Sequence, residues 1–391
     1  MINAVVLGAA RTAVATSRKG SLADTTAEEL AVPVVKALLE RTGVAPELVD
    51  DLIFAESLYG GGDIARYVAL ATGLTGAAGI AVNRHCAGSL AAVSMAAATV
   101  HSGMDRLVIA GGTQSFSTMP VMQRRIPGTV DDMEQNWMPM ADPPREGFNQ
   151  RDMTLVVGWT SALGAGLTRE AQDAWALRSH QRAVAAIDSG QFEAEIVPIQ
   201  ARQKDGTFRD FRVDEHPRRE LTAERMASLK PLHPEIEDFA ITAGNSSGVN
   251  DAAAALVVAN GDFAKAQGYE PIARIRGWAQ IGNDPNECGL APILCIPKLL
   301  DRTGVRQEDI ALWEINEAFA SVPLATCNVL GIDQDKVNIS GSGCSLGHPV
   351  SASGARMLTT LIHDLKRRGG GLGVATMCAA AGQAGAVLVE V

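Results

Sequence analysis

The sequence is poor in aromatic residues, in cysteine and in long apolar runs. Aromatic residues make up 4% of its 391 residues, and six cysteines are scattered along the chain without any CxxC pair. That pattern fits neither a disulfide framework nor a zinc site, so we expect free thiols and no metal. No apolar run approaches the roughly 18 residues of a membrane span. Arg11 also comes too early for a signal peptide, so we predict a cytoplasmic protein without a membrane partner.

Positive charge is in short supply as well. Lys and Arg number 34 against 44 Asp and Glu, which gives a net charge of −10 at pH 7. Nucleic-acid binding depends on clustered Lys and Arg that face phosphates, so we expect no nucleic-acid partner. Apolar residues are abundant at 47%, and there are 39 glycines. A chain of this length and composition can bury a large core in two or three globular units.

The chain contains an internal duplication. The stretches LLERTGVAPELVDDLIFAES from Leu38 and LLDRTGVRQEDIALWEINEA from Leu299 share a helical pattern, an RTGV turn, an acidic segment and a β-rich run. Each is followed by a Gly-rich loop, a small-residue helix (89–101 and 351–366) and an apolar strand. This alternation predicts an α/β fold with a mostly parallel sheet covered by helices on both faces. We expect the two halves to pack about a pseudo-twofold axis.

A segment of different composition separates the halves. It contains the Met- and Pro-rich run NWMPMADPP and the helical run TREAQDAWALRSHQRAVAAI. Long insertions of this kind are usually lids or binding elements. We therefore predict a first half of residues 1–118 with 246–268, an inserted cap of residues 119–245, and a second half of residues 269–391.

Four polar or thiol side chains stand where reactive groups could gather. Cys86 in VNRHCAGSLAAV precedes a predicted helix, whose unsatisfied N–H groups would favour a thiolate. His348 lies in the corresponding Gly-rich loop of the second half, and Cys378 ends an apolar strand. Asn316 in EINEAFAS follows a strand and begins a predicted helix. The alternatives are two core cysteines, a surface histidine and an N-cap asparagine.

Together these motifs resemble the thiolase family over nearly the whole chain. The matching stretches, in order, are AARTAVATSRKGSLAD, VNRHC, AGGTQSFSTMP, ITAGNSSGVNDAAAAL, INEAFA, GHPVSASGAR and MCAAAGQAGA. The resemblance implies a five-layered α-β-α-β-α fold of duplicated sheets with an inserted loop domain. It also implies reversible thiolytic cleavage or Claisen condensation of a 3-oxoacyl-CoA, with CoA and acyl-CoA as partners and no cofactor besides CoA as substrate. A homodimer or homotetramer is expected.

The same resemblance implies the residue roles. Cys86 would accept the acyl group as a thioester, and His348 would activate it and hold the thioester oxygen with a water positioned by Asn316. Cys378 would move the proton of the carbon–carbon step. A second oxyanion site would consist of the backbone N–H groups of Cys86 and Ala380. Thiolates suit thioester exchange, and a developing enolate needs prearranged donors.

Substrate contacts are also carried over from the resemblance. It places Ala243 and Ser247 along the pantetheine, Arg218 near the adenosine, Phe319 in the acyl and pantetheine channel, and Met153 at the acyl pocket. For Arg218 the alternative is an exposed surface cation, and the neighbouring Arg219 leaves the choice open.

The sequence departs from the family pattern at three places. CAGS replaces the usual CGSG at Cys86, CAA replaces CxG at Cys378, and RDMTLVVGWTSALGAG (151–166) replaces the HMGxTAE that short-chain members often have. We therefore do not assume acetoacetyl-CoA as the substrate. One alternative is a ketoacyl-synthase-like condensing enzyme, which would have a second histidine where this chain has Asn316. The other is a catalytically weak acyl-CoA or lipid-binding relative.

Overall fold

Each half of the chain builds one part of a large mixed sheet. The computed structural model describes residues 2–59, 61–143 and 150–391. The first part has the spatial order β4-β3-β5-β10-β1 and the second part β12-β13-β14-β11. The strands of the first part are β1 (Ala4–Arg11), β3 (Asp51–Ala55), β4 (Ile80–Val82), β5 (Leu107–Gln114) and β10 (Asn250–Asn260), and β2 (Ala15–Thr16) pairs with β10. Those of the second part are β11 (Ala273–Gly282), β12 (Ile310–Ile315), β13 (Leu372–Ala379) and β14 (Gln383–Glu390).

The strand directions confirm the duplication and correct one expectation. In the first part β3 is parallel to β5, and β10 is antiparallel to both β5 and β1. In the second part β12 is parallel to β13, and β14 is antiparallel to both β13 and β11. The sheet is therefore mixed rather than mostly parallel, because an antiparallel strand lies beside each parallel pair. Strand β1 also pairs with β11, which joins the two parts edge to edge.

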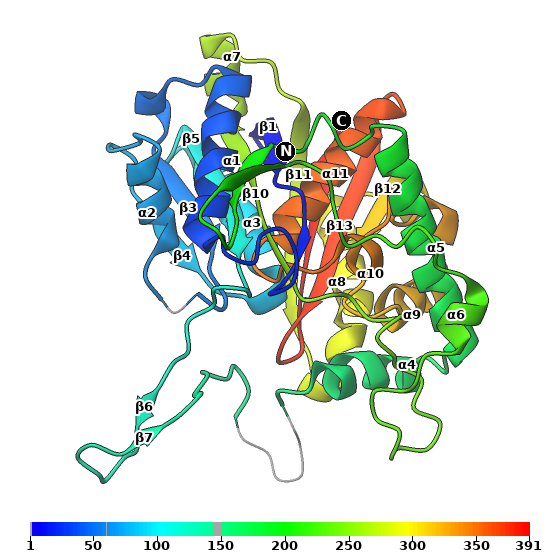
Figure 1. The fold of residues 1–391 in the computed structure, drawn as a ribbon. Coiled ribbons are helices and arrows are strands. Elements are labelled where there is room, and N and C mark those ends of the chain that lie inside the picture. The colour runs from blue at the N-terminus through cyan, green and yellow to red at the C-terminus, as the bar shows by residue number, and fades with distance from the viewer. Residues whose placement is uncertain (1, 60, 144–149) are drawn as a thin grey trace.

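Three helical layers enclose and separate the two parts of the sheet (Figure 1). Helices α1 and α2 pack on the outer face of the first part, and α8 and α9 pack on the outer face of the second. Helices α3 and α11 lie between the parts and contact both. These layers agree with the predicted α-β-α-β-α order. The helices are α1 (Ala27–Thr42), α2 (Ile64–Ala71), α3 (Gly88–Ser102), α7 (Gly261–Gln267), α8 (Ala291–Thr303), α9 (Ser321–Leu330), α10 (Gly343–Leu346) and α11 (Ser353–Arg367).

The repeated RTGV sequence ends corresponding helices. Gly43 after α1 and Gly304 after α8 have φ of 66° and 67°, the left-handed conformation that glycine adopts at helix ends. A β-bulge also recurs, between Val6 and Gly8 of β1 and between Ile275 and Gly277 of β11. The sequence repeat therefore corresponds to a repeat of local backbone geometry.

The inserted segment, teal to green in Figure 1, packs against the outer cores of both parts. Its long helix α5 (Arg169–Asp188) matches the predicted helical run and begins at Thr168, whose side chain accepts a hydrogen bond from the N–H of Ala171. The remaining elements are β6 (Arg124–Arg125), β7 (Met133–Glu134), a π-helix (Thr154–Trp159), α4 (Thr160–Gly164), β8 (Ile199–Arg202), β9 (Phe208–Phe211) and α6 (Ala223–Ala227). In the described ranges, no helix is both long and apolar enough to cross a membrane.

The two halves are in close contact at Gly112 of β5. A Cβ atom there would lie 2.0 Å from the carbonyl oxygen of Ser351 in the second half. We expect Gly112→Ala to lower the free energy of unfolding by about 1–3 kcal/mol, because rigid backbone must move to admit the methyl group. Urea denaturation would measure the change.

A matched control is Gly76→Ala. A Cβ at Gly76 meets no heavy atom within 4 Å. This variant should unfold at the same urea concentration as the unaltered protein. Equal stability of the Gly112 and Gly76 variants would contradict a rigid contact between the halves.

Candidate active site

Cys86 is presented by a strained turn at the start of α3. It lies in a short 3₁₀ helix, His85–Ala87, immediately before α3. His85 has φ of 43°, a conformation that costs about 1–3 kcal/mol and must be held by its surroundings. The N–H of His85 donates to Asn83 Oδ1 at 2.8 Å, and Ser57 Oγ donates to the carbonyl of His85 at 2.8 Å. These bonds fix the direction in which Cys86 points.

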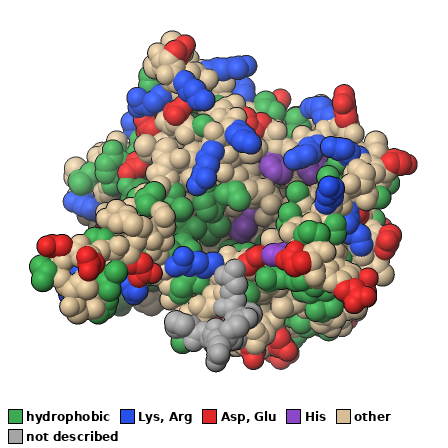
Figure 2. All heavy atoms as spheres, turned by 60° about the horizontal axis from the view of Figure 1, so that its bottom comes forward, with side chains coloured by type: hydrophobic (Ala, Val, Ile, Leu, Met, Phe, Trp, Pro, Cys, Tyr) green, Lys and Arg blue, Asp and Glu red, His purple; other side chains and the backbone are tan. Residues whose placement is uncertain are grey.

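The Cys86 loop and the His348 loop meet across the seam between the halves. The N–H of Ser57 donates to Ser351 Oγ at 2.8 Å, and Ser351 Oγ donates to Gln114 Oε1 at 3.0 Å. Cys86 and His348 line one cavity of about 700 Å³. Figure 2 shows hydrophobic side chains inside a hollow on this face, with histidines and basic side chains close by. The structure thus brings the two predicted loops together.

His348 is held in one tautomer. Its Nδ1 lies 2.6 Å from Ser353 Oγ, and the Ser353 hydroxyl donates to the carbonyl of Pro349 at 2.9 Å. Because a hydroxyl carries one hydrogen, Ser353 must accept from Nδ1–H, which assigns a bare Nε2. That Nε2 atom is buried and has no hydrogen-bond partner among the described residues. It is free to accept a proton.

The structure corrects the prediction that Cys86 is a ready thiolate. Burial, followed by the charge of Cys288, raises the pKa of the Cys86 thiol to about 12, although the N–H groups of Ala380 and Cys86 oppose the rise. Burial, followed by the positive charge of Arg356, lowers the pKa of His348 to about 3. Desolvation outweighs the nearby helix end. The site therefore holds a neutral thiol and a neutral imidazole.

Asn316 follows β12 and is completely buried. The expectation that a helix begins there is wrong, because α9 starts at Ser321, and Asn316 is not an N-cap. Neither side-chain amide atom of Asn316 has a partner among the described residues. Leaving a buried polar group unpaired costs about 1–3 kcal/mol, so such an amide is suited to bind a water or ligand atom. Asn316 is not one of the residues that line the cavity.

The carboxylate of Glu317 joins three parts of the chain. It accepts hydrogen bonds from Trp175 Nε1 at 2.9 Å and Ser179 Oγ at 2.6 Å, both on α5 of the inserted segment. It also accepts from Asn338 Nδ2 at 2.8 Å and from the N–H of Cys344 in α10 at 3.0 Å. Four donors compensate the burial of this carboxylate. Glu317 thereby links helix α5 of the inserted segment to the loop before His348 and fixes their relative positions.

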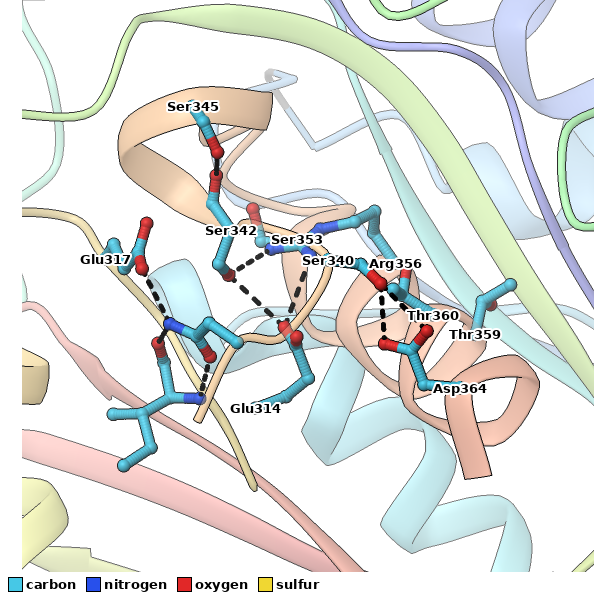
Figure 3. Close-up of polar contacts among 12 residues, drawn as sticks. Glu314, Glu317, Ser340, Ser342, Ser345, Ser353, Arg356, Thr359, Thr360 and Asp364 are labelled. Atoms are coloured by element: carbon cyan, nitrogen blue, oxygen red, sulfur yellow. Dashed lines mark hydrogen bonds and ion pairs between the residues drawn. The ribbon is translucent and has the colours of Figure 1, made fainter. Parts of the chain in front are cut away.

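A second buried group supports the same loop (Figure 3). Arg356 on α11 lies 3.3 Å from Glu314, and its other terminal nitrogen donates to Ser342 Oγ at 3.0 Å. Ser340 Oγ donates to Asp364 at 2.8 Å. Ser340 and Ser342 immediately precede α10, so charged groups on β12 and α11 fix the chain leading to His348.

Cys378 lies at the end of β13, as predicted, and lines the cavity with Ala380. The N–H of Ala380 opposes the rise in the pKa of the Cys86 thiol. A third thiol, Cys288, lines the same cavity, and its Sγ donates to the carbonyl of Ala379 at 3.1 Å. The sequence predicts no role for Cys288, because this single cysteine in NDPNECGL belongs to no catalytic or metal-binding motif.

All five predicted substrate contacts line the cavity, namely Met153, Arg218, Ala243, Ser247 and Phe319. Arg218 is preferred over its neighbour, because Arg219 pairs with Asp188 at 2.7 Å. The N–H of Ser247 donates to the carbonyl of Ala318 at 2.9 Å, which fixes this wall. These five residues therefore share one cavity with Cys86, His348 and Cys378.

The altered CAGS sequence contributes to packing. Ser89 is fully buried, and its hydroxyl accepts a hydrogen bond from the N–H of Ala355 on α11 at 3.0 Å. Helices α3 and α11 are thereby joined directly behind the nucleophile. Cys86 lines the cavity with this altered sequence behind it.

The raised pKa of Cys86 predicts how the thiol reacts with iodoacetamide. Alkylation depends on the thiolate, whose fraction grows about tenfold per pH unit below the pKa. Because that pKa is about 12, the alkylation rate of Cys86 should keep rising from about pH 7 to about pH 10. Mass spectrometry of the Cys86 peptide measures the rate, with free cysteine as the reference. A plateau near the ordinary thiol pKa of about 8.5 would contradict this prediction.

Comparisons with known proteins identify the family. Residues 4–262 match the thiolase N-terminal domain and residues 269–391 the thiolase C-terminal domain. The chain is 38% identical to an acetyl-CoA acetyltransferase of Pseudomonas aeruginosa, over 98% of both chains. It resembles the crystal structure of a Bacillus anthracis acetyl-CoA acetyltransferase (TM-score 0.90, 36% identity, covering 100% of this chain and 99% of that one). It also resembles human mitochondrial 3-ketoacyl-CoA thiolase (TM-score 0.88, 32% identity, 99% and 98% covered). The chain belongs to the thiolase family.

Proposed function

We propose that this protein is a CoA-dependent acyltransferase of the thiolase type, with Cys86 as the acyl carrier. Similarity to acetyl-CoA acetyltransferases over the full chain supports the reaction class. The observation that carries the assignment of the carrier is the meeting of Cys86, His348 and Cys378 in one cavity. These side chains come from both halves of the duplicated fold.

The first half-reaction is acylation of Cys86. His348 Nε2 takes the proton of the Cys86 thiol as the sulfur attacks the thioester carbonyl. The C–S bond to CoA breaks as the acyl group is transferred, and Cys378 gives its proton to the leaving CoA thiolate, which leaves Cys378 as a thiolate. A neutral imidazole with a bare Nε2 is suited to this role. Because neither group is ionised beforehand, proton transfer and attack are coupled. Backbone N–H groups near the Cys86 sulfur, including that of Ala380, stabilise the developing oxyanion.

The second half-reaction makes or breaks a carbon–carbon bond. In condensation Cys378 removes a proton from the methyl group of acetyl-CoA, and the enolate attacks the acyl group on Cys86. In thiolysis Cys378 returns that proton to the leaving carbanion. His348 holds the thioester oxygen of the second substrate together with a water, which the unpaired amide of Asn316 positions.

We propose a short- or medium-chain 3-oxoacyl-CoA as the substrate. Phe319 and Met153 wall the acyl end together with Val156 and Val157 of the π-helix, an apolar surface suited to an alkyl group. The pantetheine arm would run past Ala243 and Ser247 toward Arg218 at the exposed edge. The reaction requires no cofactor besides CoA, which is itself a substrate.

Assembly and location stay predictions of the sequence and the family resemblance. We expect a homodimer or homotetramer in the cytoplasm. Light scattering of the purified protein would determine the assembly.

A ketoacyl synthase is not favoured, since Asn316 stands where such an enzyme would have a histidine. A weak binding relative is not favoured either, since the predicted catalytic thiols and His348 all line the cavity.

Incubation with a 3-oxoacyl-CoA tests the proposed acyl carrier. The protein should gain one acyl group, seen by intact mass, and peptide mapping should place it on Cys86. Cys86→Ala should lose the adduct and lower thiolysis by about 10⁴-fold or more, because the covalent route is gone. Cys327→Ala, which removes a buried thiol of the outer core, is the control and should acylate normally. Thiolysis retained by Cys86→Ala would refute the assignment.

The tautomer of His348 provides a second test. Ser353→Ala removes the acceptor of Nδ1–H, so the ring can rotate or change tautomer. The rate of Cys86 acylation should fall about 10- to 100-fold with little change in KM, as for other partners that orient a functional histidine. Stopped-flow measurement of CoA release gives this rate.

Thr359→Val is the matched control for Ser353→Ala. It deletes another buried hydroxyl of α11, which donates to the carbonyl of Ala355. This variant should acylate normally. Equal losses in both variants would indicate general damage to α11 instead of an effect on the imidazole.

A further inference from the structure

One imidazole joins the proposed acyl wall to a turn of the inserted segment. Side chains from residues 153–157, at the start of the π-helix, line the cavity, and so does Leu232 of the turn at residues 231–239. His233 follows Leu232, and its Nε2 lies 3.0 Å from Asp152 Oδ2 and 3.1 Å from Thr154 Oγ1. The ring therefore links the two cavity-lining segments from outside the cavity.

Asp152 holds the first turn of that wall. Its Oδ1 accepts hydrogen bonds from the N–H of Thr154 at 3.0 Å and from the Thr154 hydroxyl at 2.6 Å. The carbonyl of Asp152 accepts from the N–H groups of Leu155 and Val156 at 3.1 and 3.0 Å. Because the Thr154 hydroxyl gives its hydrogen to Asp152, its oxygen is an acceptor for His233 Nε2–H. An imidazole bound to Asp152 and Thr154 therefore fixes the start of the π-helix.

Both ring nitrogens of His233 face carboxylates. Nε2 faces Asp152, from the segment before the π-helix, and Nδ1 lies 2.8 Å from Oε1 of Glu235, on the same turn as His233. An ionised carboxylate can only accept, so the two bonds require a ring that carries two hydrogens. The hydrogen bond with Glu235, followed by the charge of Asp152, raises the pKa of His233 above its ordinary value, although desolvation opposes the rise. The bonded form of His233 is therefore the imidazolium.

Aromatic contacts connect His233 to the other end of the π-helix. The ring of Phe239 meets that of His233 edge to face, with centroids 5.0 Å apart. Phe239 also packs against Trp159, the last residue of the π-helix, with centroids 5.0 Å apart. Phe239 belongs to the same buried apolar cluster as Phe319 and Cys378. A change in the position of the His233 ring would thus reach the wall from both ends.

We propose that His233 is a positioning residue whose imidazolium form holds the acyl wall in place and so limits the length of acyl chain that the pocket admits. This inference rests on the proposed function. The bonded form is complete below the ordinary imidazole pKa of about 6.5 and is lost as the pH rises through the higher pKa of the folded protein. When the proton leaves, one ring nitrogen faces a carboxylate without a hydrogen, and the remaining bond is no longer strengthened by charge. The wall then moves more easily and admits a longer chain.

The preference for acyl length across pH tests this role. We compare kcat/KM for thiolysis of 3-oxodecanoyl-CoA with that of 3-oxohexanoyl-CoA, so that ionisations common to both substrates cancel in the ratio. In the unaltered protein this ratio should rise about 3- to 10-fold between about pH 6 and about pH 9, since charge-assisted bonds are about twice as strong as neutral ones. His233→Phe keeps a ring beside Phe239 but lacks both hydrogen bonds, so its ratio should be high at every pH. A ratio that does not rise in the unaltered protein, or that rises equally in His233→Phe, would overturn the proposed role.

Glu235→Gln separates the charge from the contact. Glutamine can still accept a hydrogen bond from Nδ1–H, but a neutral partner raises the pKa of His233 less. The rise in the ratio should therefore move to lower pH. The control is Glu237→Gln, which removes an exposed charge from the same turn and should leave the pH profile unchanged. Identical profiles for Glu235→Gln and the unaltered protein would contradict a role for the charged imidazole.

Hydrogen exchange measures the wall without turnover. In peptides that cover residues 153–159, amide exchange corrected for the intrinsic effect of pH should be faster at about pH 9 than at about pH 6. His233→Phe should exchange quickly at both. Exchange rates that do not depend on His233 would overturn the inference while leaving the proposed function intact. If the unaltered protein cleaves neither thioester, the proposed function is refuted, and the exchange rates still show whether His233 holds the wall.

Discussion

Desolvation at the seam between the two halves is the constraint on which the site depends. Burial raises the pKa of Cys86 and lowers that of His348, so both groups are neutral when no substrate is bound. In such surroundings a proton can move only between partners that are already aligned. Ser353 supplies one such partner by taking Nδ1–H, which leaves Nε2 as the single basic position of the ring. The reactivity of Cys86 therefore depends on how its thiol and the imidazole of His348 are aligned, and not on a preformed thiolate–imidazolium ion pair.

The alignment in turn depends on buried charge behind the cavity. Glu317 and the Glu314–Arg356 pair hold the chain from residue 338 to His348 against β12, α11 and the inserted segment. Burial, opposed by the charge of Arg356, raises the pKa of Glu314 to about 8, so this carboxyl is largely neutral at pH 7. Removing one partner leaves a buried polar group unpaired at a cost of about 1–3 kcal/mol, so these contacts resist local opening. The loop that carries His348 is rich in glycine and serine, and residues 340–349 are buried. Its packing and the carboxylates that accept its hydrogen bonds together hold it in place.

Local sequence patterns predicted much of this architecture. The RTGV repeat, the long helix of the inserted segment and the strand before Cys378 all follow from periodicity and turn residues, and the structure has them. The thiolate at Cys86 was wrongly predicted because a helix end is visible in sequence, whereas desolvation by residues from both halves is not. A helix at Asn316 was wrong for a similar reason, since long-range hydrogen bonds of the neighbouring Glu317 hold that segment extended. Cys288 was missed because its partners lie far along the chain, on β13 and the following turn.

Duplication explains why these groups meet, and also why they differ. Equivalent loops before α3 and α11 approach each other between the two parts of the sheet, so each copy supplies one loop to the same cavity. Two identical loops would bring two nucleophiles or two bases together, and neither pair could transfer a proton in a defined direction. Cys86 in one loop and His348 in the other provide a donor and an acceptor at the junction. Cys378, which also lines the cavity, lies in the second copy, so the proposed proton carrier of the carbon–carbon step comes from the same half as His348.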